Sequence, residues 1–277
     1  MFEHMTGKRW SLIPWIAVVI GVTAFALGIF GRATAVSEIM AGAEGAPVVL
    51  ELFTSQGCSS CTPADALLSE IGSSTRGVIP LAYHVDYWNN LSWSDPFSSH
   101  QFSERQGAYA NALNLPGDYT PQAVIGGSAQ CVGSDSRSIS RAIDAARSTS
   151  SLGRVDLHTS LSTDRPRTLL IRLEAKSWKG AGAGNREVIV AIFENGLVQK
   201  IGAGENGGRE ITYDYTVRRL IPAFELDSGH EGSEEKRLSV DLDPSWPIDH
   251  LGVAAFIQDT ASLQIFAAAS QYPIAKN

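Results

Sequence analysis

The feature that most constrains the fold of this chain is a pair of cysteines at the junction of a strand and a helix. The stretch ELFTSQGCSSCTPADALLSEI starts as a β-rich apolar run and continues with apolar residues at helical spacing, and Cys58 and Cys61 stand where one becomes the other. A C-x-x-C pair at that place can exchange disulfides, form half of a metal site or act as a structural cross-link. The rest of the sequence is needed to choose among these three.

The N-terminal 35 residues differ in kind from those that follow. Residues 10–31 carry no charge and follow the basic pair Lys8-Arg9. Such a run spans about 30 Å of hydrocarbon at about 1.5 Å per residue, and its basic flank should stay in the cytoplasm. We therefore expect an exported protein, either periplasmic or otherwise extracytoplasmic. Residues 33–35 read Ala-Thr-Ala, which signal peptidase can cleave, so residues 1–35 are predicted to be either a signal peptide or a membrane anchor that spans the bilayer through residues 10–31.

Charge and cysteine usage narrow the function. The formal net charge is −7, and no basic run is longer than a pair, so the sequence lacks the electrostatic footprint of a nucleic-acid-binding protein. Outside the cytoplasm a cysteine pair can persist as a disulfide. If Cys58 and Cys61 pair with each other, Cys131 is left over; we expect a free thiol there, with an intermolecular disulfide or a third redox thiol as alternatives.

Hydrophobic periodicity predicts two folded regions after a linker at residues 36–46. Residues 47–150 are predicted to form an α/β domain with the order β-α-β-α-β-β-α. Its expected strands and helices, in chain order, are residues 48–54, 61–74, 78–88, 96–115, 119–127, 128–134 and 135–150. Residues 151–277 alternate strand patterns with turn residues and predict an all-β antiparallel, sandwich-like domain. That second domain is predicted to carry no part of the cysteine site.

This order of elements resembles the thioredoxin-like fold. The C-x-x-C pair at the first helix falls where that fold places its cysteines, and Thr120-Pro121 falls where it places a cis-proline that faces them. The stretches ELFTSQGCSSC, HVDYWN, YTPQ, VGSD and GENGGREITYDYTVRRL also resemble the DUF1223 family of secreted bacterial proteins. That resemblance, from about residue 47 to about 275, implies a thioredoxin-like domain fused to a β-rich domain, with no established activity.

The chemistry of the pair follows from its place at a helix N-terminus. Backbone N–H groups and the helix dipole there stabilise a thiolate, which is the attacking species in disulfide exchange. We therefore predict that Cys58 is the nucleophile and Cys61 the resolving cysteine, with the two intervening serines as hydrogen-bond donors. The resemblance to thioredoxins implies that Thr120 and Pro121 present backbone to the substrate. It also implies that Glu51, in the preceding strand, moves protons to and from the second cysteine, although Glu51 can equally be a buried carboxylate paired with a neighbour.

Other candidate residues surround the second predicted strand. His84 and Asp86 are two residues apart on this strand, so their side chains should point to the same face. We expect them to have a structural role or to tune the cysteine site. A second C-x-x-C or an H-x-x-x-H is absent, so neither a metal nor a cofactor is predicted. Several aromatic residues follow, and they either pack the loop onto the core or form a rim that receives a protein substrate. These are Tyr83, Tyr87, Trp88, Trp93 and Phe97.

Two functions remain open on this reading. The first is an exported, possibly membrane-tethered thiol–disulfide oxidoreductase whose partners are protein thiols or disulfides. The second is a non-catalytic thioredoxin-like binding module, or an accessory subunit of a membrane complex, in which the Cys58–Cys61 disulfide is only structural. The reduction potential of the pair distinguishes them.

Overall fold

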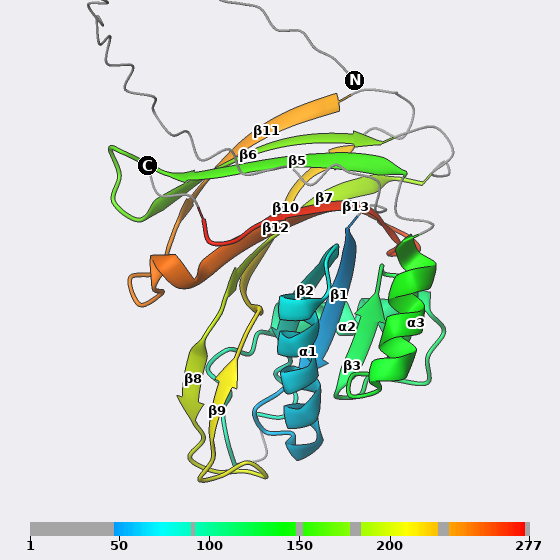
Figure 1. The fold of residues 1–277 in the computed structure, drawn as a ribbon, viewed down its shortest axis with the longest axis vertical. Coiled ribbons are helices and arrows are strands. Elements are labelled where there is room, and N and C mark those ends of the chain that lie inside the picture. The colour runs from blue at the N-terminus through cyan, green and yellow to red at the C-terminus, as the bar shows by residue number, and fades with distance from the viewer. Residues whose placement is uncertain (1–46, 90–91, 148–151, 178–183, 227–232, 275–277) are drawn as a thin grey trace, which may run out of the picture. The chain divides into compact units, whose positions relative to one another are not determined.

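The structure is a computed structural model that describes residues 47–89, 92–147, 152–177, 184–226 and 233–274 (Figure 1). All of these belong to the unit Gly42–Asn277. The predicted segment 1–35, the predicted linker 36–46 and the predicted boundary between residues 150 and 151 lie outside the described residues. No helix in the described ranges is long and apolar enough to cross a membrane.

The N-terminal half alternates strands and helices near the predicted positions. Its elements are β1 Val48–Thr54, α1 Thr62–Ser74, β2 Val78–His84, α2 His100–Ala112, β3 Gln122–Ile125, β4 Ala129–Val132 and α3 Ser136–Arg147. Every residue of β1 is buried, as expected for a central strand. The 3₁₀ turn Ser59–Cys61 leads into α1, which has Pro63 in its first turn, where a missing N–H costs little.

The C-terminal half consists almost entirely of strands. These are β5 Gly153–Leu161, β6 Thr168–Ser177, β7 Arg186–Glu194, β8 Leu197–Lys200, β9 Glu210–Tyr213, β10 Thr216–Leu226, β11 Ser233–Asp241, β12 Leu251–Asp259 and β13 Ile265–Gln271. A single 3₁₀ turn, Ile248–His250, interrupts the described part of this series.

The two halves share one mixed sheet of eight strands. Its order is β13-β12-β7-β10-β2-β1-β3-β4, so strands from both halves of the chain lie side by side. The junction is between β10 and β2, where Thr216 pairs in parallel with Ala82 and the Ala82 N–H donates to the carbonyl of Tyr215 at 2.8 Å. The remaining strands form the sheets β11-β6-β5 and β8-β9.

The predicted fold class is therefore wrong. A thioredoxin-like α/β domain followed by a separate all-β domain would have two sheets, whereas the protein is mostly β and one sheet runs through both halves. The physical reason is that β2 would otherwise be an edge strand with unpaired backbone groups, and β10 covers that edge. Periodicity marks where strands occur but not which strand pairs with an open edge.

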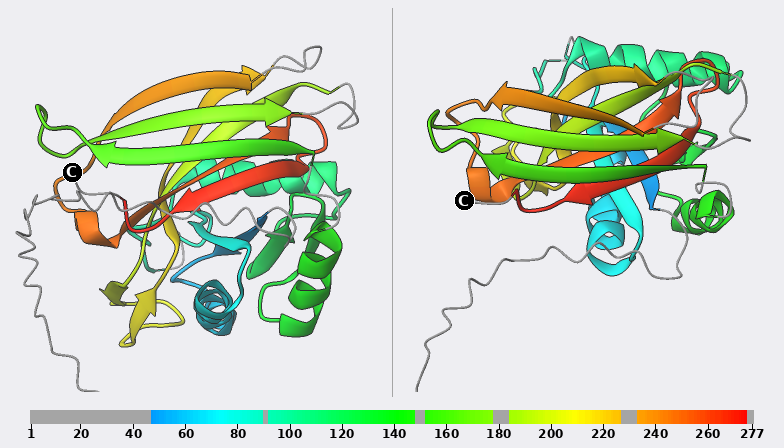
Figure 2. Two further views of the ribbon diagram at one scale, coloured as in Figure 1. Left: turned by 45° about the horizontal axis from the view of Figure 1, so that its top comes forward. Right: turned by 90° about the horizontal axis from the view of Figure 1, so that it is seen from above.

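Three packed layers result. The sheet β11-β6-β5 covers one face of the β7–β12 part of the large sheet, as Figure 2 shows from two further directions, and α2 packs on the other face. Helices α1 and α3 lie on the face of β1 opposite to α2. The hairpin of β8 and β9 extends beside α1 (Figure 1). We call β8, β9 and the loop between them, residues 197–213, the arm.

Candidate functional site

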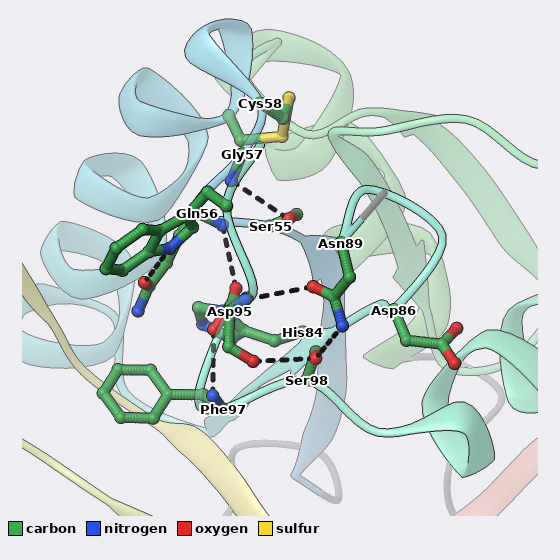
Figure 3. Close-up of polar contacts among 12 residues, drawn as sticks. Ser55, Gln56, Gly57, Cys58, His84, Asp86, Asn89, Asp95, Phe97 and Ser98 are labelled. Atoms are coloured by element: carbon green, nitrogen blue, oxygen red, sulfur yellow. Dashed lines mark hydrogen bonds and ion pairs between the residues drawn. A yellow bond between two sulfur atoms is a disulfide. The ribbon is translucent and has the colours of Figure 1, made fainter. Parts of the chain in front are cut away.

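Cys58 and Cys61 form a disulfide at the start of the first helix, with their Cα atoms 5.4 Å apart. β1 ends at Thr54, and a turn then brings the Cys58 N–H to the Ser55 carbonyl at 3.1 Å. Cys58 has an extended backbone and precedes the 3₁₀ turn, while Cys61 is already helical with φ −77° and ψ −32°. The pair therefore joins the last extended residue to the first helical turn, as Figure 3 shows for the Cys58 side.

The sulfur of Cys58 has a hydrogen-bonding neighbour within its own loop. The Ser60 hydroxyl lies 3.3 Å from Cys58 Sγ. In the reduced protein this hydroxyl is placed to donate to a Cys58 thiolate, and the N-terminus of α1 adds the favourable end of the helix dipole. The two features together favour the thiolate form of Cys58.

Both cysteines are buried, with 0% of either residue exposed. Part of the cover comes from the arm. The Asn206 side-chain amide donates to the carbonyl oxygens of Gln56 at 2.9 Å and Cys58 at 3.1 Å, and the Glu205 carboxylate accepts the Ser59 N–H at 2.9 Å. The expectation that the second half of the chain carries no part of the cysteine site is wrong.

Glu205 and Asn206 were missed by sequence reasoning, although a signal was present. They lie in the stretch GENGGRE, which belongs to one of the family-like motifs, but nothing in that stretch by itself indicates a contact with the cysteines. Gly208 has a φ of +83° and Gly204 a φ of +76°, so the loop needs glycine at these turns. Their conformations set the path of the loop on either side of Glu205 and Asn206.

A buried ion pair lies beneath the cysteine loop. His84 Nδ1 lies 2.7 Å from Asp95 Oδ2, and the same oxygen accepts the Gln56 N–H at 2.9 Å (Figure 3). Asp95 Oδ1 accepts the N–H of Phe97 at 2.9 Å. Burial by itself would lower the pKa of His84, but Asp95 and the nearby Asp65 carry that pKa above its ordinary value. Burial would raise the pKa of Asp95, but His84 and backbone donors hold it below its ordinary value.

Asp65 is a second buried acid at this site. It lies in the first turn of α1, four residues after Cys61, and is 8% exposed. Burial raises the pKa of its carboxyl from 3.8 to about 7, while His84 and Thr54 oppose the rise and Asp95 adds to it. Sequence reasoning missed Asp65, whose signal is a single acidic residue on the apolar face of the predicted helix.

Thr120 and Pro121 lie next to the end of β1, because the following residue, Gln122, pairs with Phe53. The Thr120–Pro121 peptide bond is cis. Trp88 connects this segment to the cysteine loop. Its Nε1 donates to Thr120 Oγ1 at 2.9 Å, and a methyl group added at Gly57 would meet Trp88 Cβ at 3.3 Å.

Glu51 does not face α1. It is fully buried on the opposite side of β1, where its carboxylate pairs with Arg105 Nε at 2.7 Å and accepts the Tyr109 hydroxyl. Gln258 in turn donates to Tyr109 at 2.8 Å and accepts from Arg105 at 3.1 Å. Glu51 is thus a buried carboxylate with two side-chain partners, which matches the second of the two roles predicted for it.

The other candidate residues do not gather at one site. His84 is buried, whereas Asp86 follows the end of β2 and contacts His100 and Ser103 on α2, so the two do not act as a pair. Trp93 Nε1 donates to Gln56 Oε1 at 2.9 Å. Phe97 packs edge-on against the His84 ring, and Tyr83 is fully buried, so these rings pack the loop onto the core.

Tyr87 differs from the other aromatic residues of this stretch in being 39% exposed. Cys131 is a free, half-buried thiol on β4, and burial raises its pKa. Within the described ranges, no three His, Cys, Asp or Glu side chains are arranged to hold a metal ion.

The chain is similar to one protein family and to several solved structures. The model of the family described as "Protein of unknown function (DUF1223)" matches residues 49–258. Among curated proteins, none matches this sequence. The crystal structure of protein AGR_C_4864 from Agrobacterium tumefaciens is similar, with 28% identity, a TM-score of 0.65 and coverage of 85% of this chain and 98% of that one. HBP35 of Porphyromonas gingivalis has 15% identity and a TM-score of 0.62, with coverage of 84% and 76%, a likeness of fold alone.

Proposed function

The chain belongs to the DUF1223 family, and from that premise we propose that it is an exported thiol–disulfide oxidoreductase acting on protein thiols or disulfides through Cys58 and Cys61. One observation carries the proposal. The Cys58–Cys61 disulfide closes the first turn of a helix, and the Ser60 hydroxyl lies 3.3 Å from the sulfur of Cys58. This arrangement stabilises a thiolate at the first cysteine and keeps the second within bonding distance of it.

The proposed reaction exchanges one disulfide for another. The Cys58 thiolate attacks a substrate disulfide, whose S–S bond breaks and releases one substrate sulfur as a thiolate. Cys61 then attacks Cys58 Sγ, which closes the Cys58–Cys61 disulfide and releases the second substrate sulfur. The pair loses two electrons and the substrate gains them; the reverse sequence oxidises a substrate dithiol and needs no cofactor in either direction.

Substrate access requires the arm to move. Both cysteines are fully buried, and the arm binds the backbone of this loop, since Asn206 donates to the carbonyls of Gln56 and Cys58 and Glu205 accepts the Ser59 N–H. Trp88 and the Thr120–Pro121 segment lie next to the same loop, and we assign to Thr120 and Pro121 the role of presenting backbone to the incoming chain. The arm then opens as a substrate approaches.

The proposed location follows from residues 10–31. A signal peptide or an anchor there exports the cysteine site to a compartment in which disulfides persist, the periplasm or another extracytoplasmic space. An anchored form would also meet partners in a membrane complex. N-terminal sequencing of the native protein distinguishes the two forms, because a start at Val36 means cleavage and an intact Met1 means an anchor.

A second candidate function is favoured by the burial of both sulfurs. In a binding module with a structural disulfide, the arm would seal the pair permanently. Redox titration of a Cys131→Ser variant against dithiols of known potential separates the two functions. A potential between about −270 and −120 mV supports exchange, whereas one below about −300 mV supports a structural cross-link.

Trapping in cells supplies an independent test of exchange. In the Cys131→Ser background, Cys61→Ser should accumulate mixed disulfides through Cys58 on exported proteins, visible on non-reducing gels. Cys58→Ser should accumulate none. If the Cys61→Ser protein traps nothing and the intact pair resists strong dithiols, the exchange function is wrong.

A further inference from the structure

Three buried polar side chains, two of which interact with each other, lie together near the start of α1. They are Asp65 on α1, Thr54 at the end of β1, which interacts with the Asp65 carboxyl, and His84 on β2, whose Nε2 has no hydrogen-bond partner among the described residues. Leaving a buried polar group unpaired costs about 1 to 3 kcal/mol, so such atoms call for an explanation. Asp65, Thr54 and His84 come from three different elements, and His84 Nε2 is the atom of this group that lacks a partner in the described part of the chain.

Asp65 has a fixed geometric relation to the resolving cysteine. The two residues are four positions apart, and Cys61 already has helical φ and ψ values. Side chains at positions i and i+4 lie on the same face of a helix, with about 5 to 6 Å between their Cβ atoms. Both residues are buried, so Asp65 and Cys61 lie on the same buried face of the first turn of α1.

We propose that Asp65 is the acid–base group that takes the proton from Cys61 when this thiol attacks, and returns it in the reverse direction. The inference rests on the proposed exchange function. It assigns to Asp65 the proton-transfer role first predicted for Glu51, whose carboxylate is paired with Arg105 on the other face of β1. His84 and Asp95 are positioning residues that act through Asp65.

The charges facing Asp65 tune it for this task. His84 on β2, Asp95 on the loop after β2, and Tyr213 on β9 surround the carboxyl, and Arg218 on β10 faces His84. Burial raises the pKa of Tyr213, so that its hydroxyl stays neutral. With a pKa of about 7, the Asp65 carboxyl can both accept and release a proton near neutral pH.

In the mixed disulfide, Cys61 carries a proton and Cys58 is bonded to the substrate sulfur. The Asp65 carboxylate takes the Cys61 proton, the resulting thiolate forms the Cys58–Cys61 bond, and the Cys58–substrate bond breaks. The substrate leaves as a thiolate, and Asp65 releases its proton to that thiolate or to water.

The test follows a glutathione mixed disulfide in the Cys131→Ser protein. Reduced protein is mixed with oxidised glutathione, and the formation and resolution of the Cys58–glutathione bond are timed across pH 5 to 10. In the parent protein, the resolution rate should rise with an apparent pKa near 7. Asp65→Asn should slow resolution about 10- to 100-fold and move the profile toward the pKa of a thiol, about 8.5 or above, without slowing formation.

Two matched variants complete the design. Glu70→Gln removes an exposed acid from the same helix and should leave both steps unchanged. Asp65→Glu retains a carboxyl and should restore part of the rate and the profile near pH 7.

The outcomes separate this inference from the proposed function. If the parent protein forms no mixed disulfide, the exchange function itself fails. If it exchanges and Asp65→Asn retains the parent profile, only the role of Asp65 fails. If Asp65→Asn does not fold, the pH profile of the parent protein still tests the role of Asp65. A resolution rate that rises only with an apparent pKa of about 8.5 or above, that of a thiol, overturns the assignment.

Discussion

The side-chain amide of Asn206 donates a 3.1 Å hydrogen bond to the carbonyl oxygen of Cys58, although the two residues are 148 positions apart. The strand-rich half of the chain thus contributes directly to the surroundings of the disulfide. Because this contact and the Glu205–Ser59 contact come from one loop, both are lost together when the arm moves.

Removing the Asn206 amide should make the disulfide easier to reduce. Asn206→Ala removes the donor to the Gln56 carbonyl and one of two donors to the Cys58 carbonyl, which keeps the Cys61 N–H, and should lower the free energy of unfolding by about 1 to 3 kcal/mol. It should also accelerate reduction by dithiothreitol, by about tenfold for each 1.4 kcal/mol lost from the closed arm. Thiol labelling over time measures this, with Val198→Ala, an exposed change on the same arm, as the control. An unchanged rate in a destabilised variant would contradict a covering role.

Glu205 should oppose the thiolate of Cys58. Its carboxylate accepts the Ser59 N–H just before the N-terminus of α1. A Cys58 thiolate would be a second negative charge close to this carboxylate and is therefore disfavoured. Glu205→Gln keeps an acceptor but removes the charge, so the pKa of the Cys58 thiol should fall in the reduced protein. Alkylation of Cys58 near neutral pH should be faster on the order of two- to fivefold. Glu210→Gln, also exposed on the arm, is the control, and equal rates for both variants would refute the effect.

Asp65 should make stability decline as pH rises. Its pKa is about 7 in the folded protein against 3.8 when unfolded, so the folded state binds more protons between these values. The stabilisation is full below about pH 4 and is lost as pH rises through about 7, on the order of 2 kcal/mol between pH 5 and 7. His84, whose pKa is also raised, acts in the same direction. Urea unfolding should give a flatter pH dependence for Asp65→Asn; parallel curves would contradict this.

The Glu51–Arg105 pair should matter for stability and not for exchange. Arg105→Met leaves a fully buried carboxylate without its cation and should cost about 3 to 5 kcal/mol. Adding Glu51→Gln to that variant should recover part of the loss. Glu51→Gln alone should leave the reduction potential of the cysteine pair unchanged. A shifted potential would mean that Glu51 takes part in proton transfer after all.

Cys131 should be the one free thiol of the oxidised protein. Thiol counting after denaturation should give one, and a Cys131→Ser variant none. In the folded protein its reaction with a disulfide reagent should be slow near neutral pH, because burial and then Asp135 raise its pKa. A count of zero for the parent protein would mean that Cys131 is in a disulfide.

The positions of local elements could be predicted from the sequence, whereas contacts between distant segments could not. The junction of β1 and α1 at Cys58 was predicted because periodicity and proline placement act over a few residues. The pairing of β10 with β2 depends on which backbone groups would otherwise stay exposed, and no local pattern records that. Asn206 could be located only once the arm was seen against the cysteine loop.

The buried charges illustrate the same limit within the site. Glu51 was predicted to be either a proton carrier or a buried carboxylate paired with a neighbour, and its partner, Arg105, comes from a helix 54 positions later. Asp65 had a visible signal, an acid four residues after Cys61 on an apolar face. Its raised pKa arises from burial under neighbours on β2 and β9, which only the folded structure brings together.

The proposed opening of the arm would make the reactivity of the cysteine pair depend on a partner that binds the arm and never contacts the sulfurs. Glu205 and Asn206 bind the backbone beside Cys58. If exchange requires the arm to open, as proposed above, the population of the open arm and the reactivity of the pair are a single equilibrium. Such coupling is reciprocal. A partner that holds the arm open speeds electron transfer, and if reduction loosens the arm, the reduced protein binds that partner more tightly by the same factor.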